Sequence, residues 1–216
     1  MLNNLISSTM KLQFGELNIT PRVENRLQEL GYTVEELESA IAKHKSSCDD
    51  GNPSVYVGTY GKYNDCSLCG LWIDLTSFSD YDEFIDFCKA IHADEYDPEL
   101  MAQDFECFPR QWYNEGFMSR EDFDNILEYS EMCEKYDADA VDDYMEYHDS
   151  LDNFEDAYCG EWKSEEDFAE HIIDECYDLD RIMGNLSGYF DYKRFADDLF
   201  MSDYTMGEHG HVFRNI

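Results

Sequence analysis

The sequence predicts an α+β fold, arranged as a chain of small domains with a helical appendage at the N-terminus. Acidity changes near residue 52: residues 1–52 hold 8 acids and 5 bases, which leaves 42 acids and 10 bases for residues 53–216. The hydrophobic period becomes two after residue 53 and returns to the helical period after residue 79. Residues typical of helix N-caps precede several of the helical patterns.

Residues 1–52 are predicted to form a helical extension. Thr20 and Pro21 open one helical pattern, Thr33 and Glu36 form a capping box for a second, and a glycine separates the two. The extension is expected to end near residues 48–53, because the charge balance, the turn-forming residues and a proline all change there.

Residues 53–115 are predicted to be a first domain, made of an antiparallel sheet and a helix. Residues 55–59 alternate, residues 60–65 form a turn region, and residues 68–75 return as an apolar strand, which predicts a hairpin. Ser79 begins a predicted capping box for a helix that covers the sheet. Residues 101–116 are expected to be irregular.

Two further domains are predicted to follow. Residues 116–153 form a helical unit, whose first helix is capped by Ser119 and Asp122 and whose second begins near Asp137. Residues 154–216 form an α+β unit, with a helix capped at Ser164, a further helix over residues 192–200 and a strand-like end over residues 204–216.

The charge balance excludes several classes of partner. The 216 residues contain 50 Asp and Glu against 15 Lys and Arg, a formal net charge of -35. Such a chain repels polyanions, so it is expected to bind neither nucleic acid nor an anionic membrane surface, and its partner should be basic. A hydrophobic fraction of 43% argues against disorder and is enough for a core.

The compartment is predicted from two features. The first residues lack the basic and apolar regions of a signal peptide, and no stretch approaches the roughly 20 apolar residues of a membrane span. A soluble cytoplasmic protein is therefore expected, with its eight cysteines as reduced thiols.

Two stretches of the sequence have features of a metal site, but neither favours one, and no cofactor is expected. Cys66 and Cys69 have the spacing of half a zinc site, but no second pair does, so packing in the hairpin is favoured; the residues that would have to complete such a site are Cys107, Cys159, His209 and His211. Residues 137–148 have acids at alternate positions, yet Asp142 and His148 stand where a calcium loop needs glycine and an acid. The acids of this stretch, Asp143 included, are therefore expected on a solvated helix face.

No enzyme is expected either. His209 and His211 are accompanied by no carboxylate, cysteine or serine constellation at catalytic spacing, and the chain has no glycine-rich phosphate loop, nucleophile elbow or zinc-protease helix motif.

The informative feature is the series of acids along the outer faces of the predicted helices. Acids three or four residues apart on a helix are neighbours and destabilise it by a few tenths of a kcal/mol per pair. Solubility alone is served by a net charge of magnitude about 2 to 8. The acids predicted to bind a partner are Glu121, Asp124, Glu128, Glu131, Asp142, Glu146, Glu166, Glu170, Asp174 and Asp178.

Duplex DNA gives a scale for this charge. It carries one negative charge per roughly 1.7 Å of axis, so the net 32 negative charges of residues 53–216 match about 54 Å of duplex, and two chains about 110 Å. A protein that imitates double-stranded DNA is physically plausible. Composition alone leaves open the simpler alternative, a solvated acidic surface.

Several segments resemble the ArdA antirestriction family, in the family's order and over about residues 54–216. The opening matches are SVYVGTYGKYN at 54–64 and GLWID at 70–74, and the closing ones are YFDYKRFADDL at 189–199 and GEHGHVF at 207–213. AQDF at 102–105 and FEDAY at 154–158 also match. Residues 1–52 lie outside the resemblance.

The resemblance implies a protein carried on plasmids and conjugative transposons that imitates B-form DNA and inhibits type I restriction-modification enzymes. It implies an elongated, curved homodimer of chains with three small domains each. The acidic faces would occupy the DNA groove formed by the specificity subunit and two modification subunits, so the inhibitor needs no chemistry.

The resemblance also suggests where the dimer forms. The family's antirestriction motif lies at the dimer contact and corresponds here to residues 179–192. Family members often carry proline there, whereas this chain has Gly184, Asn185 and Leu186. We expect the contact around Leu186, Tyr189 and Phe190; these side chains could equally be core.

Two other classes stay open at this stage. One is an acidic interaction module for another basic DNA-binding protein, and the other is a metal-binding or catalytic protein built on Cys66, Cys69 and the terminal histidines.

Overall fold

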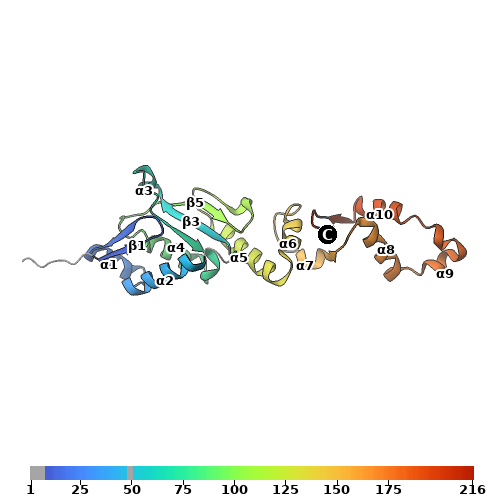
Figure 1. The fold of residues 1–216 in the computed structure, drawn as a ribbon, viewed down its shortest axis with the longest axis horizontal. Coiled ribbons are helices and arrows are strands. Elements are labelled where there is room, and N and C mark those ends of the chain that lie inside the picture. Colours follow the sequence, from blue (N-terminus) through green and yellow to red (C-terminus); the bar gives the residue numbers. More distant parts are fainter. Residues whose placement is uncertain (1–7, 48–50) are drawn as a thin grey trace, which may run out of the picture. The chain divides into compact units, whose positions relative to one another are not determined.

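The computed structural model describes residues 8–47 and 51–216 (Figure 1). The chain divides into two compact units, Met1–Ser130 and Glu131–Ile216, and the division falls within helix α5 (Arg120–Lys135). Helices and three small antiparallel sheets make up the described part, so the predicted α+β class is confirmed. The predicted division into segments 1–52, 53–115, 116–153 and 154–216 stays a prediction.

The N-terminal segment contains more than the predicted helices. Strands β1 (Ser8–Lys11) and β2 (Glu16–Ile19) form an antiparallel hairpin before α1 (Pro21–Glu29) and α2 (Val34–Ser47). The prediction of a purely helical segment is therefore wrong. Each strand of this hairpin has only four residues. The alternation of apolar and polar residues over so short a stretch does not distinguish a strand from a loop in the sequence. The predicted caps are confirmed, because Thr20 and Thr33 accept hydrogen bonds from the backbone amides three residues on.

The first unit is built on a three-stranded antiparallel sheet in the order β4-β3-β5. Strands β3 (Ser54–Thr59) and β4 (Leu71–Asp74) confirm the predicted hairpin, although the predicted turn contains a short helix, α3 (Tyr60–Asn64). Strand β5 (Leu100–Glu106) lies in the stretch predicted to be irregular, so that prediction is wrong. A shift in register beside Tyr56 and Val57 interrupts its alternation, and this hides the strand in the sequence.

The helix α4 (Tyr81–Ala90) follows a short 3-10 turn, η1 (Leu75–Ser77), and buries Phe84, Phe87 and Cys88. Its N-cap is Asp80 and not the predicted Ser79: Asp80 accepts from the amide of Glu83 at 2.9 Å. A second 3-10 turn, η2 (Arg110–Trp112), precedes α5.

The N-terminal segment is part of the core of the first unit. Helix α2 packs along β4, and the imidazole of His44 accepts a hydrogen bond from the amide of Asp74 at 3.3 Å. Its ring stacks on Phe78, with centroids 5.4 Å apart. In the turn between β1 and β2, a Cβ on Gly15 would stand 2.6 Å from the sulfur of Cys69. The segment is therefore not a loosely attached appendage.

His44 predicts a dependence of stability on pH. Burial lowers its pKa to about 4, while an unfolded histidine titrates near 6.5. Because the unfolded chain then binds the proton more tightly, stability falls as the pH drops below about 6.5, by about 2 kcal/mol at pH 5. We expect His44→Gln to flatten the change in melting temperature between pH 7 and 5. An unchanged slope would show that His44 is protonated in the folded state. His209→Gln in the second unit is the control of opposite sign: the hydrogen bond to Asp143 raises the pKa of His209, so its loss should steepen the slope.

The second unit packs a few short elements around Tyr144, Phe154, Phe168 and Phe213, all fully buried. Its sheet has the order β6 (Tyr158–Glu161), β8 (His211–Arg214), β7 (Tyr204–Met206), and the predicted strand-like end corresponds to β7 and β8. The caps predicted here at Asp137 and Ser164 are confirmed, as is the cap predicted at Ser119 in the first unit. The elements are α6 (Ala138–Met145), α7 (Phe154–Ala157), β6 (Tyr158–Glu161), α8 (Glu165–Cys176), α9 (Leu179–Met183), η3 (Gly184–Tyr189), α10 (Tyr192–Phe200), β7 (Tyr204–Met206) and β8 (His211–Arg214).

Candidate partner-binding surface

All ten acids predicted to bind a partner are exposed. On α5 the side chains of Phe123, Ile126 and Tyr129 are buried, so the acids between them project away from the core. The same holds on α6, α8 and the start of α9. The exposed acids are Glu121, Asp124 and Glu128 in the first unit and Glu131, Asp142, Glu146, Glu166, Glu170, Asp174 and Asp178 in the second.

The acidic charge is hardly neutralised within the chain. Glu128 and Asp142 each take part in an interaction within the chain. Among the residues that the structure describes, the other eight acids form no ion pair with lysine, arginine or histidine. Their carboxylates are therefore available to a basic partner.

One acidic hollow lies in the second unit, where the end of α8 approaches α9 and η3. It encloses about 660 Å³ and includes Asp174 and Asp178, two of the predicted acids, beside Glu175 and Asp180. Asp178 also caps α9, because its carboxylate accepts from the amide of Arg181 at 3.0 Å.

Asp143 differs from the other acids of α6. The sequence assigned it to the solvated face, but it is only 1% exposed and lies against Gly207 and His209. The backbone amide of His209 donates to both carboxylate oxygens, and the ring Nδ1 lies 2.8 Å from Oδ1. This hydrogen bond raises the pKa of His209. The predicted solvated position was therefore wrong, and His209 anchors the loop between β7 and β8 to α6.

The segment predicted to form the dimer contact is open to solvent. Leu186 is 61% exposed and Tyr189 is 84% exposed, so neither belongs to the core of the chain. Phe190 is half-buried against Tyr192, with ring centroids 5.0 Å apart. The sequence missed Ile182 on α9, which is also exposed.

Gly184 has a backbone conformation that favours glycine. Its φ of 55° lies in the left-handed region, where glycine is favoured, and it ends α9 and begins η3. Proline fixes φ near −65° and is incompatible with that conformation.

The Cys66 and Cys69 pair does not assemble a metal site. Cys69 is buried under Gly15, and burial raises the pKa of its thiol, whereas Cys66 is exposed. No group of three or more histidine, cysteine or acidic residues in residues 8–47 and 51–216 has the geometry to hold a metal ion.

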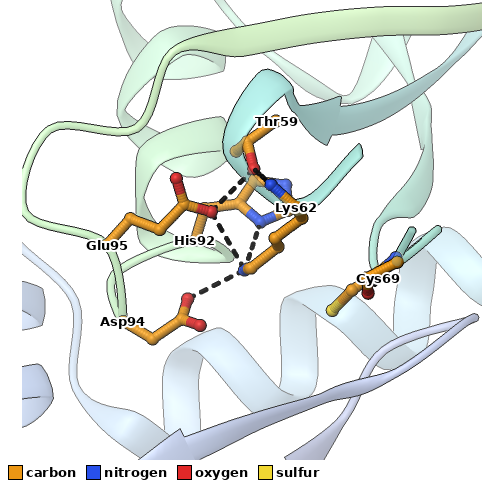
Figure 2. A network of polar contacts seen from close by, with 7 residues as sticks. Thr59, Lys62, Cys69, His92, Asp94 and Glu95 are labelled. Atoms are coloured by element: carbon orange, nitrogen blue, oxygen red, sulfur yellow. Dashed lines mark hydrogen bonds and ion pairs between the residues drawn. The ribbon is translucent and has the colours of Figure 1, made fainter. Parts of the chain in front are cut away.

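A polar network beside Cys69 fixes α3 to the loop that follows α4 (Figure 2). The ammonium of Lys62 lies 2.9 Å from a carboxylate oxygen of Asp94, 2.9 Å from Nδ1 of His92 and 3.6 Å from Glu95. The hydroxyl of Thr59 donates to Glu95 at 2.6 Å and accepts from the amide of Lys62, which caps the helix. Burial and the nearby ammonium lower the pKa of His92 to about 3, so the imidazole stays neutral and accepts from Lys62.

Lys62 is expected to be the structural centre of this network. In Lys62→Met the stem is retained, but Asp94 and the buried imidazole of His92 lose their hydrogen-bond donor and Glu95 loses its ion pair. This should cost about 2 kcal/mol of unfolding free energy. Chemical denaturation measures the change. Lys89→Met on α4, which removes the same charge, is the control and should cost much less. Equal losses in the two variants would contradict a special role for Lys62.

The chain was compared with protein families and with curated proteins. No helix in the described part of the chain is long and apolar enough to cross a membrane. The comparison with curated proteins gives no match. The family described as antirestriction protein (ArdA) matches residues 55–213, which is most of the chain. Proteins of this family are non-catalytic and interact with restriction enzymes. The chain therefore belongs to the ArdA family of antirestriction proteins.

Proposed function

We propose that this antirestriction protein imitates B-form DNA and competitively inhibits type I restriction-modification enzymes. Its acidic faces would occupy the DNA-binding groove formed by the specificity and modification subunits. The observation that carries the proposal is the exposure of all ten predicted acids on the outer faces of helices.

The spacing of these acids supports the comparison with DNA. A helix rises 1.5 Å per residue, so acids three or four residues apart present one charge per about 5 Å of a face. A DNA strand presents one phosphate per 3.4 Å. The second unit alone, residues 131–216, holds 25 acids against 6 bases. A basic groove built for phosphates would therefore meet a similar density of negative charge.

The proposed inhibition needs no bond to be made or broken. Affinity arises from many carboxylates that meet lysine and arginine, so association should be fast and weakened by salt, and no single acid should dominate. Since the target acts on DNA inside the cell, we place the protein in the cytoplasm.

The proposal is tested by plating unmodified phage on a host with an active type I restriction system, with and without this protein. Relief of restriction is expected. In purified form, duplex DNA should compete with the protein for the enzyme, and binding should weaken steeply between 50 and 200 mM salt, as it does for DNA itself. Binding without competition by DNA would favour the other function, an acidic module for a different basic surface.

We also propose that the protein acts as a homodimer, joined through Leu186, Tyr189 and Phe190. Two large side chains of this segment are exposed next to the exposed Ile182, and apolar groups of this size gain free energy when a partner covers them. A dimer would double the length of duplex that the acidic surface imitates.

A further inference from the structure

A pocket lies on the three-stranded sheet of the first unit. Across this sheet Trp72 on β4 pairs with Tyr56 on β3, and Tyr56 pairs with Asp104 on β5. The rings of Tyr56 and Trp72 meet edge to face, with centroids 5.7 Å apart. Two aromatic rings and a carboxylate thus form one row over three strands.

Side chains from three other segments turn this row into a pocket of about 360 Å³. Phe14 reaches it from the turn between β1 and β2 and meets Tyr56 edge to face at 6.1 Å. Tyr63 of α3, Leu68 and Glu115 also line it, together with Met101 and Gln103. Phe14 is 57% exposed and Tyr63 is 50% exposed, so much of their apolar surface lines the opening. A pocket of this size suits one side chain or a small molecule.

The backbone around the pocket holds these groups in place. The hydroxyl of Tyr56 donates to the carbonyl of Leu68 at 2.6 Å, and the amide of Gly70 donates to the carbonyl of Phe14 at 3.1 Å. The carboxylate of Asp104 accepts from the amide of Phe105 at 2.9 Å, and the carbonyl of Glu115 accepts from the amide of Ala102 at 3.2 Å. The polar network around Lys62 fixes α3, which carries Tyr63 (Figure 2).

The pocket combines aromatic faces with carboxylates, and no basic residue lines it. Elsewhere in the first unit the chain supplies arginines to its own aromatic rings: Arg110 lies 4.7 Å from the ring of Tyr113, and Arg120 lies 5.1 Å from that of Tyr81. Within the described residues, the rings of the pocket form no cation–π contact with a lysine or arginine of the chain.

We propose that this pocket receives an arginine side chain of the restriction enzyme. A guanidinium stacks on aromatic faces and binds carboxylates with its planar fork, and here both are present, with Asp104 and Glu115 among the lining residues. That the arginine comes from the restriction enzyme rests on the proposed function, whereas the preference of the pocket for a guanidinium does not.

The proposal gives the N-terminal segment a role. Phe14 lies outside residues 55–213, the part that matches the family, while Tyr56, Tyr63 and Trp72 lie within it. The hairpin of β1 and β2 therefore adds one aromatic wall to a pocket whose other parts belong to the family region.

The first test uses a small probe and the full chain. Nα-acetyl-L-arginine amide is titrated while the NMR signals of the Trp72 indole and of Phe14 and Tyr63 are followed, and the neutral isostere Nα-acetyl-L-citrulline amide is the control. We expect saturable shifts at these rings with the arginine probe and little change with citrulline. Equal binding of the two probes, or shifts that rise linearly without saturation, would overturn the proposal.

Variants then locate the site. Phe14→Ala should weaken the arginine probe about two- to fivefold, as expected for an exposed cation–π contact, whereas Tyr147→Ala, at an equally exposed tyrosine of the second unit, should not. The double variant Asp104→Asn with Glu115→Gln should weaken binding of the arginine probe. The loss should be larger than in the matched double variant Asp97→Asn with Glu99→Gln, which removes the same charge outside the pocket. Equal losses in both pairs would mean that general charge attracts the probe and would overturn the assignment to the pocket.

An inhibition assay separates this inference from the proposed function. Phe14→Ala could bind the probe more weakly and still inhibit a type I enzyme with the potency of the unmodified chain. That result would overturn the claim that the bound arginine comes from the restriction enzyme. A severalfold loss of potency supports it. If the unmodified chain fails to inhibit, the proposed function fails, while the result with the probe still stands.

Discussion

Changing Glu128, Glu131 and Asp142 together to lysine is expected to reduce inhibition of a type I restriction enzyme by about 10- to 100-fold. Each reversal removes an attraction to a basic groove and adds a repulsion, which at exposed positions costs about 0.5–1 kcal/mol per site. Three sites then cost about 1.5–3 kcal/mol, and every 1.4 kcal/mol is tenfold in affinity. Each single reversal should have a much smaller effect, since many carboxylates share the binding.

The control for this variant has the same change in net charge. Glu24, Glu35 and Glu38 are exposed acids of α1 and α2, outside the residues that match the family. Their joint reversal to lysine should reduce inhibition by less than a few fold, through the weaker long-range attraction alone. Nuclease assays at 50 and 150 mM salt measure both variants. Equal potency of the two triple variants would mean that net charge, and not the helical acidic faces, carries the inhibition.

The sequence predicted best those features that depend on neighbours along the chain. The capping boxes at Thr33 and Ser119 are reciprocal pairs of side chain and backbone within four residues, so their chemistry is visible without the fold. The ten exposed acids could be placed for the same reason, because helical spacing alone separates an outer face from an inner one.

The features that the sequence missed depend on tertiary contacts. Asp143 has the same spacing as its exposed neighbours, and only the loop carrying Gly207 and His209, more than sixty residues away, makes it buried. Strand β5 was missed because its pattern is broken at the shift in register, and pairing with β3 decides its conformation. The pocket around Trp72 is a similar case, since its walls come from four segments far apart in the sequence.

The triple charge reversal tests binding to the restriction enzyme, whereas a second variant tests the formation of the homodimer. We expect Leu186→Glu to weaken the homodimer more than about 100-fold and to give a folded monomer. Placing an unpaired carboxylate at the centre of an apolar contact costs about 3 kcal/mol or more. Because Leu186 is exposed in the single chain, the same change should leave the melting temperature of the monomer nearly unaltered. Light scattering coupled to gel filtration measures the mass.

Met201→Glu is the matched control, because Met201 follows α10 and is 80% exposed but lies outside the predicted contact. It should remain dimeric. If Leu186→Glu stays dimeric, the contact lies elsewhere on the chain, and if it unfolds, Leu186 supports the fold in a way that its exposure does not suggest. A folded monomer would also inhibit less well, since each monomer offers about half the length of acidic surface to a groove built for continuous DNA. Loss of the dimer without any loss of inhibition would show that one chain suffices to block the enzyme.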